Sequence, residues 1–219
     1  MLEKDIENKI RQMYINREWE DRVTDMIIEF VINFQKTYGE KYIDRIINRL
    51  KDLKEIRKKY NDSKYQASSK TSYIIFFKEI KDDKQFKYIL EHELFHFIQE
   101  EGSCFEEIPT IYKDLLDDNI QILLLEEAFV QYFTACINNK QPEYTEIDEN
   151  GKIRKYWLNE CYKNIVGYVE ELENIIGKRK ILDMYMDDKC YENEIMRFDN
   201  IYGKNAFSNY IKRICKKTS

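Results

Sequence analysis

The sequence predicts a mainly helical α+β fold, with a small N-terminal sheet and a helical C-terminal lobe. Gly (6) and Pro (2) are scarce among the 219 residues, which favours long helices over many tight turns. Apolar residues recur at three- and four-residue spacing along most of the chain, the period of a helix with one buried face. Only residues 72–78 form a β-branched and aromatic run bounded by polar residues, which indicates a strand.

The first part of the chain is expected to contain helices, a loop and that strand. Helical spacing covers about 4–36, with a break near Asn16, and resumes from Tyr42 to Ile56. Residues 61–70 are rich in Ser, Asn and Lys and are predicted to be a loop. The strand at 72–78 follows directly.

The two histidines of the chain are four residues apart, at His92 and His96, with Glu93 between them. Asp82 as N-cap and Gly102 after the last turn predict a helix around this H-E-x-x-H pattern. Four-residue spacing places both imidazoles on one helix face, so both can bind one zinc ion. A Glu at the second position can take a proton from a zinc-bound water. The simpler alternative is two ordinary histidines on the flank of a helix.

A third ligand is expected on the next long helix, predicted over 119–138, which is apolar on most sides. A buried carboxylate needs a partner, and a metal ion is one of the few adequate ones. Glu126 shares its face with apolar residues, whereas Glu127 belongs to a polar stripe, so Glu127 is predicted over Glu126. The alternative is that this stripe faces bulk water. The stripe consists of Glu127, Gln131, Thr134 and Asn138.

The remainder is predicted to be a hairpin followed by helices. Asn150-Gly151, between two short stretches of alternating character, is a strong hairpin signal. Helical periodicity then covers 158–176 and stops at Gly177. Further helices are expected at about 178–187, 189–201 and 204–216.

Charge and cysteine content argue against several classes of protein. The net charge is −5 and no basic stripe stands out, which argues against a nucleic-acid partner. No apolar run approaches the length of a membrane span, and the N-terminus lacks the apolar region of a secretory signal. Five cysteines, an odd number without a CxxC pair, are typical of reduced thiols, so a cytoplasmic location is expected.

The sequence resembles the gluzincins, the zinc peptidases of the thermolysin-like clan. His92, Glu93 and His96 carry the likeness most specifically. The segment 127–134 is similar to the one that supplies the third ligand in small bacterial members. The two motifs span about 92–134, and a looser likeness extends over about 72–216.

The resemblance implies one zincin-like domain over 1–219. Its N-terminal lobe, to about residue 102, would hold the small sheet and the active-site helix, and its C-terminal lobe, from about 103, would be helical. It also implies hydrolysis of a peptide or protein substrate, with one Zn²⁺ as cofactor and Glu93 as general base. Because the strand before the metal helix pairs with an extended substrate in zincins, residues 72–78 are expected to do so. The alternative is an ordinary buried strand.

The chain departs from the family pattern in two places. Gln131 stands where larger gluzincins commonly carry a carboxylate that supports a zinc-binding His. The histidine that stabilises the oxyanion has no counterpart, because the chain has no third His. Tyr162 is predicted to be the donor instead. Tyr156, Tyr168 and Arg154 are the alternatives.

Two other classes of protein stay open on the sequence alone. One is a peptidase-like binding or regulatory module that keeps zinc without turnover, since loss of the oxyanion donor would leave binding intact. The other is a helical scaffold that never binds metal.

Overall fold

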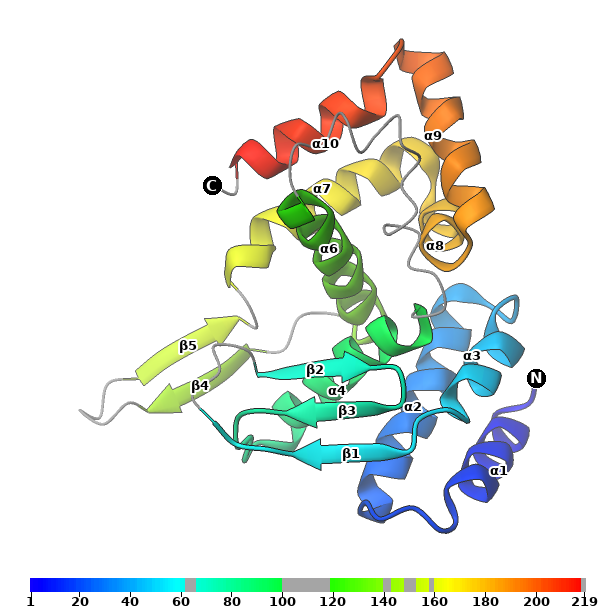
Figure 1. Cartoon of the computed structure of the whole chain (residues 1–219), viewed down its shortest axis with the longest axis vertical. Coiled ribbons are helices and arrows are strands. Elements are labelled where there is room, and N and C mark those ends of the chain that lie inside the picture. Colours follow the sequence, from blue (N-terminus) through cyan, green and yellow to red (C-terminus); the bar gives the residue numbers. More distant parts are fainter. Residues whose placement is uncertain (62–65, 100–118, 140–142, 148–152, 158–159, 218–219) are drawn as a thin grey trace. The chain divides into compact units, whose positions relative to one another are not determined.

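The computed structural model describes residues 1–61, 66–99, 119–139, 143–147, 153–157 and 160–217. The chain divides into two compact units. The first comprises Met1–Glu100 and Thr134–Tyr144, and the second comprises Glu101–Phe133 and Thr145–Ser219. Each unit is described by itself below, with the helices and strands labelled in Figure 1.

The first unit contains the N-terminal helices, a three-stranded sheet and the helix that carries both histidines. One long helix, α6 (Asn119–Ile137), begins in the second unit and ends in the first. The earlier elements are α1 (Glu3–Tyr14), α2 (Asp21–Tyr38), α3 (Ile43–Leu50), β1 (Glu55–Lys58), β2 (Ala67–Lys70), β3 (Tyr73–Phe76) and α4 (Asp83–Gln99). The predicted break near Asn16 is confirmed, because α1 and α2 are separate helices.

The sheet has the strand order β1-β3-β2, with β1 parallel and β2 antiparallel to β3. Two predictions were wrong here. Glu55 and Ile56 were expected at the end of the helix over Tyr42–Ile56, but that helix ends at Leu50, and both residues belong to β1, which pairs with β3. Residues 67–70 were expected in a loop but form β2. In both cases pairing with β3 decided the conformation of a segment without strand periodicity. β1 is distant from β3 in sequence, whereas β2 directly precedes β3 and forms a hairpin with it.

The predicted strand over 72–78 is confirmed as β3, but its expected role is not. β3 pairs with β1 on one side and with β2 on the other, so its backbone has no free edge to which an extended peptide could add. The alternative of an ordinary buried strand is the correct one: Ile74 and Phe76 are buried, and Tyr73 and Ile75 are half-buried. Among the described strands of this sheet, β1 and β2 form the edges.

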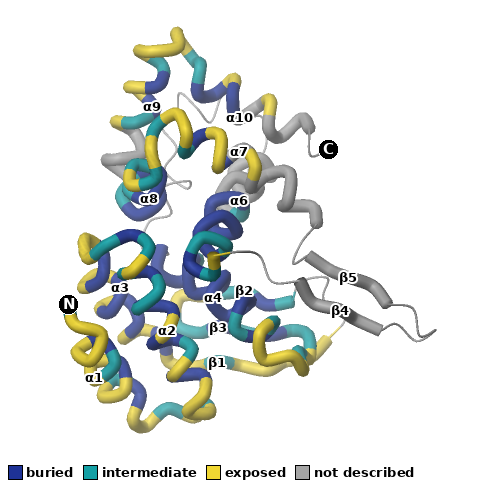
Figure 2. The backbone as a smooth tube through the Cα atoms, turned by 180° about the vertical axis from the view of Figure 1, so that it is seen from behind, coloured by how far each residue is buried: buried dark blue, intermediate teal, exposed yellow. Residues whose placement is uncertain are grey.

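α4 forms the centre of the first unit, and Figure 2 shows it buried along most of its length. The ring of Phe95 lies 5.1 Å from that of Phe30 on α2, in an edge-to-face arrangement. At the other end of the helix, Phe86 stacks on Phe76 of β3 with centroids 4.6 Å apart. These aromatic contacts hold α4 between the sheet and the N-terminal helices.

The second unit is mainly helical, as predicted. It contains β5 (Ile153–Trp157), α7 (Glu160–Ile176), α8 (Lys178–Met186), α9 (Asp188–Tyr202) and α10 (Ala206–Lys217). β5 pairs with β4 (Glu143–Ile147) in a two-stranded sheet, which confirms the predicted strands, while the turn at Asn150-Gly151 lies outside the described residues.

Aromatic packing and caps order the helices of this unit. Tyr185 of α8 packs against Phe129 and Phe133 of α6, with centroids 6.4 and 4.9 Å away. The carboxylate of Asp199 accepts hydrogen bonds from the backbone N–H groups of Asn205 and Phe207, which caps the start of α10.

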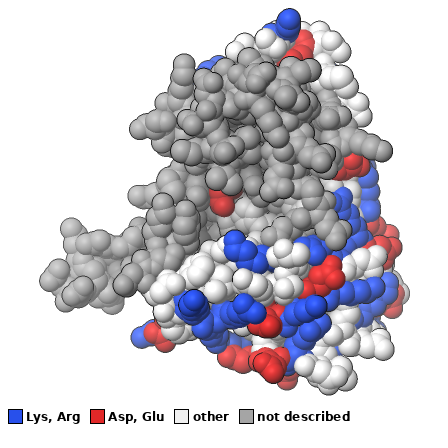
Figure 3. All heavy atoms as spheres, in the orientation of Figure 1, with Lys and Arg blue, Asp and Glu red and all other residues white. Residues whose placement is uncertain are grey.

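The mainly helical α+β class is therefore confirmed, whereas a zincin-like arrangement stays a prediction. Within the described ranges, none of the helices has the length and apolar character needed to cross a membrane. Figure 3 shows Lys and Arg interspersed with Asp and Glu on one face of the first unit. Exposed ion pairs of the first unit include Arg22–Asp83 and Arg57–Glu55, both at 2.5 Å.

Candidate metal site

The site begins with the capping of α4. The side chain of Asp82 accepts a hydrogen bond from the backbone N–H of Gln85 at 2.7 Å, and its carbonyl accepts one from Phe86 at 2.9 Å. The side-chain bond satisfies an N–H group that a helix start leaves without an intrahelical partner, and the carbonyl accepts the first intrahelical bond of α4, which together confirm Asp82 as the N-cap. The predicted C-terminal residue Gly102 lies outside the described residues.

α4 presents His92 and His96 on one face, as the spacing predicts. Their ring centroids are 5.0 Å apart and their planes are inclined by 68°. His92 and Glu93 are each 7% exposed, and His96 is half-buried. Acids are rarely buried without a partner, so the burial of Glu93 next to two histidines favours a specific role for the group.

Glu127 of α6 lies beside the two histidines. One ligand atom from each of His92, His96 and Glu127 can be chosen such that all three lie within 4.8 Å of one another. Among the described side chains, this is the single group of at least three potential metal ligands with that spacing. The structure thus brings together the three residues that the sequence predicts as ligands.

The donor set fits a catalytic zinc ion. Two imidazoles and one carboxylate are a known ligand set of catalytic zinc, which leaves a fourth position for water. Ligand atoms in a tetrahedral zinc site are about 3.3 Å apart, given bond lengths near 2.0–2.1 Å. The three atoms of His92, His96 and Glu127 lie within 4.8 Å of one another, a wider spacing than that of a bound tetrahedral site.

The polar stripe of α6 is turned toward the protein interior. Gln131 and Thr134 are fully buried, so the alternative that this stripe faces bulk water is wrong. Burying an amide and a hydroxyl costs free energy unless they form hydrogen bonds. The side chain of the rival ligand Glu126 lies outside what the structure describes.

Glu91, next to His92, is the most deeply buried acid of α4, with no exposed surface. Its Oε2 accepts a hydrogen bond from Nδ2 of Asn138 at 2.5 Å, and its Oε1 lies 3.8 Å from Nζ of Lys87. Burial raises the pKa of Glu91 to about 7, although the bond from Asn138 and the charge of Lys87 oppose the rise.

Asn138 is the residue that sequence reasoning missed as the partner of Glu91. It follows the last residue of α6, and its Nδ2 also donates to the carbonyl of Thr134 at 2.9 Å. The signal was present in the sequence, because Asn138 continues the polar stripe of Glu127 at helical spacing. The sequence alone did not show that a buried acid of α4 would lie opposite it.

The predicted oxyanion donor and its alternatives lie on α7 and β5. Tyr162 and Tyr168 lie on α7, and Tyr156 and Arg154 lie on β5, but their side chains are outside the described part of the molecule. Tyr162 therefore stays a prediction, with the same three alternatives.

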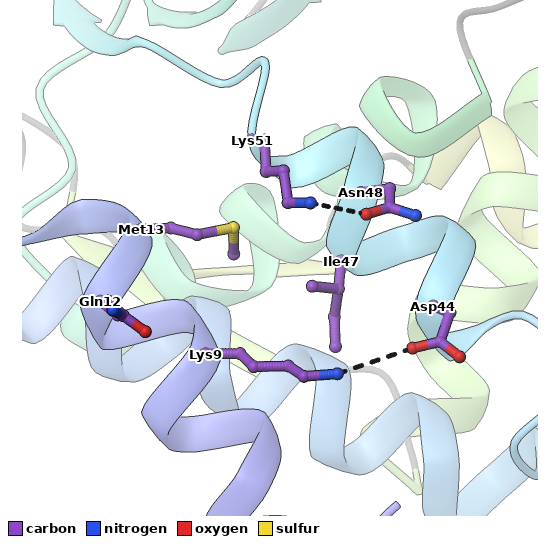
Figure 4. A pocket seen from close by; sticks show the side chains of 7 residues that line it. All are labelled: Lys9, Gln12, Met13, Asp44, Ile47, Asn48 and Lys51. Carbon is purple, nitrogen blue, oxygen red and sulfur yellow. Dashed lines mark hydrogen bonds and ion pairs between the residues drawn. The ribbon is translucent and has the colours of Figure 1, made fainter.

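A separate hollow of about 330 Å³ opens at the surface of α1 and α3, and Figure 4 shows the side chains that line it. Two of its lysines are already engaged: Lys51 donates to Asn48 at 2.8 Å, and Lys9 lies 3.8 Å from Asp44. None of the predicted site residues lines this hollow.

In comparisons with known proteins, no family model, no curated protein and no solved structure matches the chain. The site's own residues are therefore the basis for a function.

Proposed function

We propose that this protein is a zinc-dependent hydrolase of peptide bonds. The observation that carries the proposal is the convergence of His92 and His96 from α4 with Glu127 from α6. Two imidazoles and one carboxylate are a zinc donor set that leaves room for a water molecule. Glu93, the remaining acid of the motif, is buried on the same helix.

Each residue has a distinct part in the proposed reaction. Bound zinc would lower the pKa of its water toward about 7 and polarise the scissile carbonyl. Glu93 follows His92 by one residue and precedes His96 by three, and residues three apart on a helix are neighbours on its surface. From there Glu93 takes the proton of the attacking water and delivers it to the nitrogen of the leaving amine.

The substrate also needs a donor for the oxygen of its carbonyl, which becomes negatively charged as water adds. We propose the Tyr162 hydroxyl for this role, because a phenol stays neutral near pH 7 and donates without repelling a metal ion. The proposal for Tyr162 is independent of the proposal for the metal ligands.

Metal content and cleavage together test the function. Protein purified without added zinc should carry about one zinc per chain, and His96→Ala should lose most of it. Wild-type protein should cleave members of a mixture of unstructured peptides, and mass spectrometry should detect the products. Glu93→Gln keeps the size of the side chain, and should bind zinc normally but lose cleavage.

Three outcomes would redirect the proposal. Stoichiometric zinc in a His92/His96 double alanine variant would exclude this metal site. Loss of zinc in Glu93→Gln would make Glu93 a ligand rather than the base. Zinc bound by wild-type protein without any cleavage would favour the second candidate, a binding or regulatory module, which the lack of a third histidine also favours.

A further inference from the structure

The end of α6 is tied to α4 by a single side chain. Nδ2 of Asn138 donates to Glu91 Oε2 at 2.5 Å and to the Thr134 carbonyl at 2.9 Å. Glu91 and Asn138 both belong to the first unit, and Glu91 is fully buried. A buried acceptor that loses its hydrogen-bond donor cannot turn to water instead, so breaking this bond costs free energy. This contact therefore constrains where α6 ends relative to α4.

The local backbone reinforces this end point. The N–H of Asn138 donates to the carbonyl of Ala135 at 3.2 Å, and that of Asn139 donates to Cys136 at 3.3 Å. Asn139 has a φ of 59°, the left-handed conformation that stops a helix and that Asn tolerates better than most residues. α6 thus stops at a defined residue, with the Asn138 amide directed at Glu91.

Rotation of α6 determines which acid faces the histidines. Glu127 lies about 16 Å along the helix from Asn138, and both belong to the same polar stripe. A shift of one residue in register turns the helix by about 100° and would present Glu126 in place of Glu127. The packing of Phe129 and Phe133 on Tyr185 opposes such a rotation along the middle of α6, and the hydrogen bond of Asn138 adds a polar constraint at the end of the helix.

We propose that Asn138 is a positioning residue of the metal site, which through its hydrogen bond to Glu91 holds Glu127 in register with His92 and His96. The inference rests on the proposed zinc site but not on catalysis. Asn138 contacts neither the ion nor the substrate in this account. Asn138 influences zinc binding indirectly, because it fixes the rotation of α6 and so the position of Glu127.

Zinc affinity of purified protein, measured by competition with a chromogenic chelator, tests this role. Asn138→Ala should weaken zinc binding by about 10–100-fold, as loss of a partner outside the ligand shell does at other sites. Glu91→Gln should keep an affinity close to that of wild type, because its side-chain carbonyl still accepts the bond. Glu91→Met, of similar size but without an acceptor, should behave like Asn138→Ala.

Two controls separate positioning from loss of stability. Asn200→Ala removes an exposed asparagine of α9 and should leave zinc affinity unchanged. Ile10→Ala removes a fully buried side chain of α1, so it should lower the free energy of unfolding without changing zinc affinity well below the melting temperature. A similar loss of zinc affinity in Ile10→Ala and Asn138→Ala would reduce the effect to general destabilisation and overturn the proposal.

A double-mutant cycle shows whether Asn138 acts through Glu127. In a Glu127→Ala background, Asn138→Ala should have no further effect on zinc affinity. An undiminished effect there would overturn the proposal. If Glu127→Ala weakens zinc binding but Asn138→Ala does not, the positioning role fails and the metal site stands. If wild-type protein binds no zinc, or Glu127→Ala binds it normally, the ligand set itself fails and the positioning role fails with it.

Discussion

Arg49 of α3 holds the C-terminal end of α4 through Phe97. Its Nε donates to the backbone carbonyl of Phe97 at 3.1 Å, and its guanidinium carbon lies 4.5 Å from the centroid of the Phe97 ring. The same guanidinium donates to the Thr71 carbonyl at 3.2 Å and to Asp52 at 3.0 Å. A positive charge at the C-terminus of a helix is favourable, and Phe97 directly follows His96.

Replacing Arg49 should therefore destabilise the protein. Arg49 is only 7% exposed, so Arg49→Met would leave two carbonyls without their donor and remove the cation–π contact. We expect the free energy of unfolding to fall by about 1.5–3 kcal/mol, measured by urea denaturation. Arg49→Lys should recover little of it, because an ammonium group lacks the planar fork of donors. Unchanged stability in Arg49→Met would show that solvent satisfies these carbonyls.

The choice of Glu127 over Glu126 can be tested by zinc affinity. Glu127→Ala should weaken binding by more than the roughly 10–100-fold that loss of an outer partner costs, because a direct ligand is removed. Glu126→Ala is the matched control on the adjacent residue and should bind zinc normally. The reverse pattern would mean that α6 is rotated by one residue from the orientation proposed.

Removal of the metal should lower thermal stability. Zinc that binds only the folded protein stabilises it by about 2.7 kcal/mol at a free concentration of 100 Kd. For a chain of this size we expect a chelator to lower Tm by about 5–10 °C. The Tm of a His92/His96 double alanine variant should not respond to the chelator. An equal response in that variant would place the stabilising metal elsewhere.

The prediction for Tyr162 concerns turnover alone. Tyr162→Phe should lower kcat by roughly 10²–10³, the cost of removing one oxyanion donor in other hydrolases, while zinc content is retained. KM should change little if the hydroxyl acts mainly in the transition state. If Tyr162→Phe has the turnover of wild type, Tyr162 is not the oxyanion donor. The alternatives Tyr156, Tyr168 and Arg154 would then be replaced one at a time.

The local elements that position the site were predictable because they depend on local chemistry. The period of apolar residues, the cap at Asp82 and the spacing of His92 and His96 together predict α4 and the face that carries the two ligands. β3 was predictable for a similar reason, since its aromatic and β-branched run has few alternatives. The helices after Gly177 follow from their periodicity and from glycines with positive φ, such as Gly177 at 91° and Gly203 at 104°.

Contacts between distant segments decided what the sequence could not. Residues 55–58 carry no strand pattern and become β1 because β3, distant in sequence, offers them backbone partners. Residues 67–70 become β2 through a hairpin with the same strand. The same pairing closes both sides of β3 and removes its predicted role in substrate binding. The sequence by itself determined the ligand-bearing helix and the polar stripe of α6. Only the tertiary structure brought Asn138 to Glu91 and turned that stripe inward, because burial and long-range hydrogen bonds do not exist until the chain has folded.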